Sequence, residues 1–307
     1  MTSNPYAAFL PPERRSAAEL DPEESWWSWR GHRVHIARKS RPASPVRLLV
    51  IHGAGGHSGA LWPMAALLAE RGLDIAAVDL PLYGRTASPD PPSVRYEHWV
   101  RLLVDLAEAE HDGRPLVLLG ASIGGLLAYE VAARSSRVSH VVATCLLDPR
   151  DWRARARMTR FGPLGILGGP LSGMARGWLS TAMVPMSRVA KLSKMSRDAA
   201  LSRLCATDPL GGAAKVPVGF LASYMRYRHA PPEAMTVPVT LVHPGMDAWT
   251  PAELSERVLR RIAAPTEVTL LRECGHFPIE EPGLTDLVET VLEVAGRLAS
   301  NPDDGPG

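Results

Sequence analysis

The chain of 307 residues has only three cysteines and no long apolar run. Cys145, Cys205 and Cys274 form no C-x-x-C pair and are odd in number, so neither a disulfide framework nor a cysteine-rich metal site is predicted. No apolar run approaches the roughly 18 residues that a membrane-spanning helix needs. Residues 1–5 lack a basic stretch followed by an apolar one, so no secretory signal is predicted. These absences favour reduced thiols and a cytoplasmic location.

Charge is small in total but unevenly distributed along the chain. The net charge is +2, yet residues 149–236 hold 14 Lys or Arg and 4 Asp or Glu, for +10, which leaves −8 elsewhere. This basic segment lacks interleaved aromatic residues, so nucleic-acid binding is not expected. It could be a solvated helical face, or it could attract anionic esters or a membrane surface. No integral membrane segment is predicted, but surface association stays possible.

Apolar patterning predicts alternating strands and helices on both sides of residues 149–236. Continuous apolar runs are typical of parallel strands that are buried on both faces, and alternation with helices predicts a parallel sheet with right-handed crossovers. A hairpin is expected over 25–37. Further strands are expected at 47–52, 73–80, 115–120, 138–147, 238–243 and 267–272, with helices at 58–70, 94–110, 126–134, 251–262 and 283–298.

The alternation breaks after residue 148 and resumes near residue 237. The stretch 149–236 is too long for a loop, and its helical period predicts an inserted helical cap. It carries seven of the ten methionines, whose flexible side chains form adaptable apolar walls, although they could equally serve only to pack the cap. The predicted core is 25–148 and 237–300. Residues 1–24 are expected to pack loosely, and 301–307 to form a disordered tail.

The run 115–125 (PLVLLGASIGG) carries the most informative motif. An apolar strand is predicted to end at residue 120, and a helical stretch begins directly after residue 125. Residues 120–124 therefore read G-x-S-x-G between a strand and a helix, the setting in which a serine is exposed on a sharp turn. Glycines flank the serine because the turn leaves no room for Cβ atoms. Ser122 is the candidate nucleophile.

A second glycine-rich run, 52–57 (HGAGGH), directly follows the buried apolar residues 48–51. The backbone N–H groups of Ala54 and of Ile123, just after the serine, are expected to form an oxyanion hole. A phosphate-binding loop is the alternative, but the run fits neither G-x-x-x-x-G-K-[ST] nor G-x-G-x-x-G. His52 is expected to be structural.

A serine nucleophile needs a base and an acid that orients the base. His276 lies in a loop after the last predicted strand, the place in chain order that suits the base. Asp247 follows the strand 238–243 and is the candidate acid. It could instead only cap the next helix, but Thr250 is the better N-cap candidate. Asp148, at the end of the preceding strand, is the competitor.

With these motifs the chain resembles the α/β-hydrolase superfamily over about residues 25–147 and 237–299. The order Ser122, Asp247, His276 is that of the superfamily, and the chain is most similar to its lysophospholipase- and monoacylglycerol-lipase-like serine hydrolases. The resemblance implies an α/β-hydrolase fold: a mostly parallel eight-stranded sheet flanked by helices, with an inserted helical cap. One departure is 79–86 (DLPLYGRT), where many relatives have D-x-x-G-x-G-x-S; it alters the rim of the pocket and not the catalytic residues.

The activity expected from this resemblance is hydrolysis of carboxylic esters through an acyl-enzyme, with no metal or organic cofactor. The expected substrate is a small-molecule or lipid ester with an apolar acyl group. The same residues could serve a peptidase, amidase, thioesterase, C–C hydrolase or perhydrolase, and a non-catalytic ligand-binding protein could use the same scaffold. A serine at this position argues against haloalkane dehalogenase and epoxide hydrolase chemistry. The physiological substrate and the oligomeric state stay open.

Overall fold

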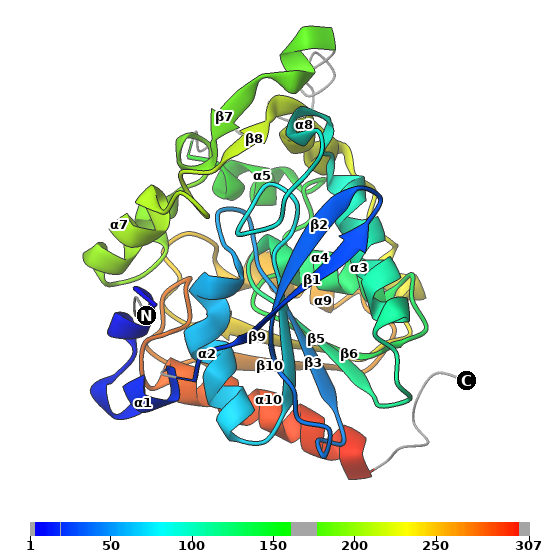
Figure 1. The fold of residues 1–307 in the computed structure, drawn as a ribbon, viewed down its shortest axis with the longest axis vertical. Helices are drawn as coiled ribbons and strands as arrows, with labels where there is room; N and C mark the ends of the chain where they lie inside the picture. The colour runs from blue at the N-terminus through cyan, green and yellow to red at the C-terminus, as the bar shows by residue number, and fades with distance from the viewer. Residues whose placement is uncertain (1–3, 19, 161–176, 301–307) are drawn as a thin grey trace.

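The fold is built on one large sheet, seen in a computed structural model that describes residues 4–18, 20–160 and 177–300. Its strand order is β1-β2-β4-β3-β5-β6-β9-β10 (Figure 1). β1 and β4 run antiparallel to β2, and the other neighbours are parallel. The expected mostly parallel, eight-stranded sheet is confirmed. The strands are β1 Glu23–Trp29, β2 His32–Lys39, β3 Arg47–Ile51, β4 Asp74–Val78, β5 Leu116–Gly120, β6 Val138–Ala143, β9 Val239–Pro244 and β10 Thr266–Leu271.

Two apolar layers form because successive side chains of a strand point to opposite faces. In β3, Leu49 and Ile51 join the core under α3, α4 and α9, whereas Leu48 and Val50 join the core under α2 and α10. The covering helices are α2 Ser58–Glu70, α3 Tyr96–Ala109, α4 Ile123–Ala132, α9 Ala252–Leu259 and α10 Gly283–Ser300. None of the described helices combines the length and apolar character needed to cross a bilayer.

Parallel strands direct their carboxyl ends to one edge of the sheet. The loops that follow β3, β5, β9 and β10 therefore meet at that edge, although they are far apart in sequence. These loops carry the glycine-rich run 52–57, Ser122, Asp247 and His276. The topology thus gathers all the candidate site residues, as ligand sites of open α/β sheets are gathered.

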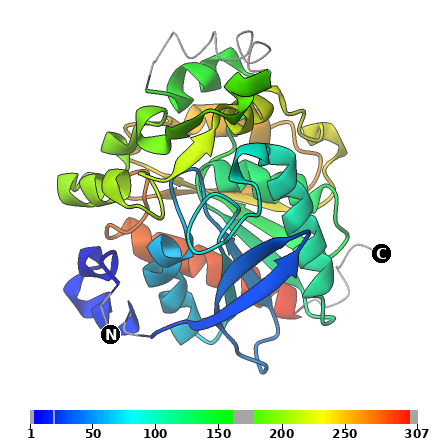
Figure 2. The same ribbon diagram turned by 45° about the horizontal axis from the view of Figure 1, so that its top comes forward.

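The connection between β6 and β9 holds a separate group of short elements above one end of the sheet (Figures 1 and 2). A helical segment was expected, and the structure also contains a short antiparallel pair of strands, β7 and β8. The glycine and proline residues between 162 and 170, which favour loops over helix, lie outside the described residues. The elements are α5 Trp152–Met158, β7 Met183–Pro185, α7 Ala199–Thr207, β8 Lys215–Pro217 and α8 Val218–Arg226, with 3-10 turns at Gly177–Thr181, Met186–Arg188, Leu192–Lys194 and Pro232–Ala234.

The N-terminal segment differs from the loose packing expected of residues 1–24. It forms 3-10 turns at Ala7–Phe9 and Pro12–Arg14 and the helix α1 Arg15–Ala18. Tyr6, Leu10 and Ala17 are buried in the core layer beneath α2 and α10. Composition misled the prediction because these few apolar residues pack on a core layer that forms only in the folded chain. The tail 301–307 lies outside the described residues.

Candidate active site

Ser122 lies on a sharp turn between β5 and α4, with φ 55° and ψ −125°. This backbone conformation is strained for a residue with a side chain. Its backbone N–H donates to Thr144 Oγ1 at 2.8 Å, which helps to hold the turn. A Cβ atom at Gly120 would lie 2.2 Å from the carbonyl oxygen of Gly124. The flanking glycine is therefore required by space, as the G-x-S-x-G pattern predicts.

His276 connects Ser122 to Asp247. Its Nε2 lies 2.9 Å from Ser122 Oγ, and its Nδ1 lies 2.7 Å from Asp247 Oδ2. With the Nδ1–H tautomer, the ring donates to the carboxylate and can accept the serine proton at Nε2. The structure thus brings together the three residues that the motifs selected from separate loops.

Asp247 is held as a carboxylate by its surroundings. The backbone N–H of Trp249 and the hydroxyl of Thr250 donate to it at 2.7 and 2.6 Å. Burial alone would raise the pKa of Asp247, but His276 and the hydrogen bonds from Thr250 outweigh burial and lower it to about 2. The carboxylate is therefore ionised across the physiological pH range and can hold the imidazole in one tautomer.

Asp148, the competing acid, lies in a different environment. Its carboxylate accepts from the guanidinium of Arg150 at 2.8 to 3.1 Å. Burial opposes ionisation of Asp148, but Arg150 lowers the pKa of the carboxyl below its usual range. The described contacts of Asp148 include neither His276 nor Ser122, so Asp148 forms a local ion pair.

The glycine-rich loop 52–57 lies directly against the serine turn. A Cβ atom at Gly53 would come 2.9 Å from Ser122 Cβ, so only glycine permits this approach. Ala54 and Ile123 line the same cavity as Ser122. Their backbone N–H groups have no hydrogen-bond acceptor among the described residues, which leaves both donors available to a ligand.

His52 supports the loop. Its Nδ1 lies 2.8 Å from the carbonyl oxygen of Gly53, and its Nε2 accepts from the backbone N–H of Leu80 at 3.0 Å. Burial lowers the pKa of His52 to about 4, so the ring is neutral near pH 7. These contacts fit the structural role expected for His52.

Three residues near the site were missed by the motif search. Thr144 supports the serine turn, Thr250 donates to Asp247, and the Trp249 ring lies 4.7 Å from that of His276. Thr250 was noted only as a helix-cap candidate. Thr144 and Trp249 belong to no pattern, because a threonine after a strand or a tryptophan in a loop is uninformative until the partner it contacts is known.

A cavity opens beside Ser122 with a volume of about 50 Å³. No charged side chain lines its described wall. Three methionines of the 149–236 segment contribute to it, while Met235 is buried in the core instead. Met174 lies outside the described residues. The lining residues are Ala54, Ser122, Ile123, Leu147, Met158, Thr159, Met186, Val189, Ala190, Phe220, Leu221, Tyr224, Met225, Trp249 and Thr250.

Cys145 lies next to the acid–base pair. Ligand atoms of Cys145, Asp247 and His276 lie within 4.8 Å of one another, the one such group of metal-ligating side chains among the described residues. Burial raises the pKa of the Cys145 thiol to about 12, and a thiol must ionise to ligate a metal. Asp247 and His276 also hydrogen-bond to each other, so the arrangement favours proton transfer over metal binding. All three cysteines are buried and free.

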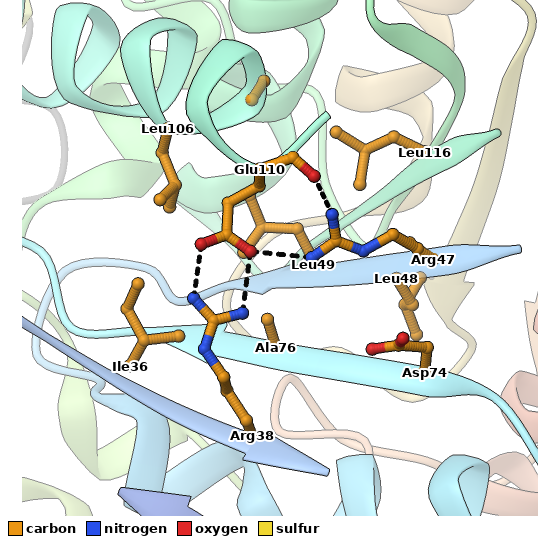
Figure 3. A pocket seen from close by; sticks show the side chains of 11 residues that line it. Ile36, Arg38, Arg47, Leu48, Leu49, Asp74, Ala76, Leu106, Glu110 and Leu116 are labelled. Carbon is orange, nitrogen blue, oxygen red and sulfur yellow. Dashed lines mark hydrogen bonds and ion pairs between the residues drawn. The ribbon is translucent and has the colours of Figure 1, made fainter. Parts of the chain in front are cut away.

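A second hollow lies where β3 and β5 begin, away from the loops that carry the site. Figure 3 shows the side chains that line it. There Glu110 receives hydrogen bonds from the guanidinium groups of Arg38 and Arg47. The two guanidinium groups share the Glu110 carboxylate, and Asp112 lies 3.8 Å from Arg47. The apolar side chains around them come from the sheet and α3. The arrangement is that of a structural ion network.

Comparison with known proteins agrees with this architecture. A family model described as "Alpha/beta hydrolase family" matches residues 48–286. A monoacylglycerol lipase of Paleococcus ferrophilus has a similar fold, with a TM-score of 0.66 and 19% identity, covering 85% of this chain and 98% of the lipase. A soluble variant of the Saccharomyces cerevisiae monoglyceride lipase gives 0.69 and 15%, covering 91% and 96%.

One curated sequence relative is the AMB antimetabolite synthetase AmbE of Pseudomonas aeruginosa. It is 36% identical over 98 residues, which are 32% of this chain and 4% of that protein. The chain therefore matches only a small part of the synthetase. The family model, by contrast, covers most of the chain, and the expected resemblance is confirmed. The chain belongs to the alpha/beta hydrolase family.

Proposed function

We propose that this protein is a serine hydrolase that cleaves carboxylic esters through an acyl-enzyme. The observation that carries the proposal is the continuous hydrogen-bonded chain from Ser122 through His276 to Asp247. Two further features support it. Ser122 borders an apolar cavity, and so do the N–H groups of Ala54 and Ile123, which have no acceptor among the described residues.

In the proposed mechanism, Ser122 Oγ attacks the ester carbonyl while His276 Nε2 takes its proton. Asp247 stabilises the resulting imidazolium through Nδ1–H. The N–H groups of Ala54 and Ile123 bind the oxyanion, an interaction worth about 3 kcal/mol per donor. His276 then returns the proton to the leaving alcohol. Water attacks the acyl-enzyme by the same route and releases the acid and free Ser122.

The acyl group is proposed to enter the cavity beside Ser122. Its walls are apolar and include Met158, Met186 and Met225, whose unbranched side chains can adapt to a ligand. The segment 149–236 would act as a cap that supplies these walls. The absence of charged side chains from the described wall favours neutral, lipid-like acyl groups over anionic ones. The two lipases of similar fold are consistent with such substrates.

A fluorophosphonate probe tests the proposal without knowledge of the substrate, because it reacts with activated serines. The labelled residue is located by mass spectrometry in the wild type, in Ser122→Ala and in Ser139→Ala, which changes a serine outside the site. We expect labelling at Ser122 that is lost in Ser122→Ala and kept in Ser139→Ala. No labelling of the folded wild type would contradict the proposal and favour a ligand-binding protein on the same scaffold.

A panel of matched substrates then tests the ester preference. The ester, thioester and anilide of one acyl group are compared by kcat/KM, and the ester is expected to be cleaved fastest relative to its rate without protein. A thioester or anilide that exceeds the ester on this scale would replace the ester assignment.

A further inference from the structure

The cavity beside Ser122 contains a polar group that its apolar walls do not explain. Thr159 follows directly after α5 and lines the cavity. The residue is 7% exposed, and its Oγ1 has no hydrogen-bond partner among the described residues. Among the described residues, five buried side-chain nitrogen or oxygen atoms lack a hydrogen-bond partner. Of these, only Thr159 Oγ1 belongs to a residue that lines the cavity.

The other polar side chains of the described wall are already engaged. Ser122 Oγ lies 2.9 Å from His276 Nε2, and the Thr250 hydroxyl donates to Asp247 Oδ2 at 2.6 Å. The Trp249 indole donates to the carbonyl of Arg157 at 2.8 Å, and the Tyr224 hydroxyl to that of Leu147 at 3.5 Å. Among the described residues of this wall, the hydroxyl of Thr159 is therefore the side-chain oxygen that remains available to a ligand.

A buried hydroxyl without a partner destabilises the folded chain, so a native example needs a reason. Valine has the same shape as threonine and would remove the penalty. Rotation about the Cα–Cβ bond moves the hydroxyl among staggered positions, so Oγ1 can turn toward a group in the cavity. The neighbouring methionine side chains can shift to admit that group.

We propose that the acyl chain of the substrate carries a hydrogen-bonding oxygen, as an oxo substituent, that pairs with Thr159 Oγ1. This inference rests on the proposed function and refines it: the substrate class is oxygenated apolar esters rather than plain alkyl esters. An unsubstituted chain would fill the apolar space but leave the hydroxyl unpaired. A site that forms such a bond discriminates against the analogue that lacks the polar group.

The test compares 4-nitrophenyl esters of hexanoic, 4-oxohexanoic and 5-oxohexanoic acid. The kcat/KM ratio of each oxo ester to the plain ester is measured in the wild type, in Thr159→Val and in Thr159→Ser. Comparing ratios between variants cancels the intrinsic reactivity of each ester. For at least one oxo ester we expect the ratio to fall about tenfold in Thr159→Val and to be largely kept in Thr159→Ser.

Thermal unfolding supplies an independent readout. Thr159→Val is expected to melt no lower than the wild type, because it removes an unpaired buried hydroxyl. Ratios that stay the same in Thr159→Val for both oxo esters, or a clear fall in its melting temperature, would overturn the inference. In those cases the wild type still hydrolyses the plain ester. A wild type that hydrolyses none of the esters and takes no fluorophosphonate would overturn the proposed function, and this inference with it.

Discussion

The indole ring of Trp249 lies against the imidazole of His276, with ring centroids 4.7 Å apart and an interplanar angle of 43°. Its Nε1–H donates to the carbonyl oxygen of Arg157, in α5, at 2.8 Å. One side chain therefore connects the segment 149–236 to the proposed catalytic base. The rotation of the base is restricted by this contact as well as by its hydrogen bond to Asp247.

Replacing Trp249 separates these two contacts. Trp249→Phe keeps an aromatic ring beside His276 and loses the bond to Arg157, whereas Trp249→Leu loses both. We expect kcat to fall by about tenfold or more in Trp249→Leu and less in Trp249→Phe, because small misplacements of a catalytic group are costly. Steady-state kinetics on a 4-nitrophenyl ester measure both. Equal losses in the two variants would contradict a role for the ring.

Asp247→Asn is expected to lower kcat by about four orders of magnitude, because an amide favours the wrong imidazole tautomer. The fold should be kept, since the side-chain oxygen of Asn can still accept from the N–H groups of Trp249 and Thr250. The matched control is Asp148→Asn, which removes a carboxylate paired with Arg150 and not with His276. Comparable losses of kcat in the two variants would refute the assignment of the acid.

Substitution of Glu110 is expected to lower the stability of the fold without changing the proposed active site. Glu110 receives hydrogen bonds from Arg38 and Arg47 at the far edge of the sheet (Figure 3). Glu110→Gln removes the carboxylate that two half-buried guanidinium groups share and leaves Arg47 only Asp112, at 3.8 Å. We expect a loss of about 1–3 kcal/mol in the free energy of unfolding. Urea unfolding measures it, and kcat should be unchanged. An unaltered free energy of unfolding would mean that the network contributes nothing.

The lowered pKa of Asp79 leads to a prediction of how the free energy of unfolding depends on pH. Burial opposes ionisation of this carboxyl, but His35 and the backbone N–H groups of Arg85 and Ser58 outweigh burial and lower the pKa of Asp79 to about 2. Because this pKa is lower in the folded than in the unfolded chain, its stabilising contribution is full above about pH 4 and is lost toward about pH 2.

The variant Asp79→Asn tests this dependence. Its deficit in the free energy of unfolding, relative to the wild type, should be largest at neutral pH and shrink below about pH 4. Urea titrations at several pH values measure the difference between the two proteins. A deficit that stays constant with pH would show that the charge of Asp79 does not contribute.

Local patterns were sufficient to predict the sheet and the residues that meet at its edge. Apolar runs such as 47–51 are typical of strands buried on both faces, and alternation with helices predicts that they are parallel. The loops after β5, β9 and β10 then share one edge, so Ser122, Asp247 and His276 could be named in advance. Glycine patterns around Ser122 were informative because they reflect steric limits of one short turn.

Contacts between segments that are distant in sequence depend on tertiary packing and produce no recognisable pattern in the local sequence. The sequence favoured Asp247 over Asp148, but the contact of Asp247 with His276 is visible only in the folded chain. The link from Trp249 to Arg157 of α5 has no counterpart in any local pattern. Thr159 looks like an ordinary residue at the end of a helix until a cavity forms around it. Likewise, Tyr6 and Leu10 are buried in a core layer that they share with α2, α10 and the sheet, and that layer forms only when the chain folds. The periodicity of apolar side chains is a property of the local sequence. Which distant side chains contact one another depends on how the helices and strands pack in three dimensions.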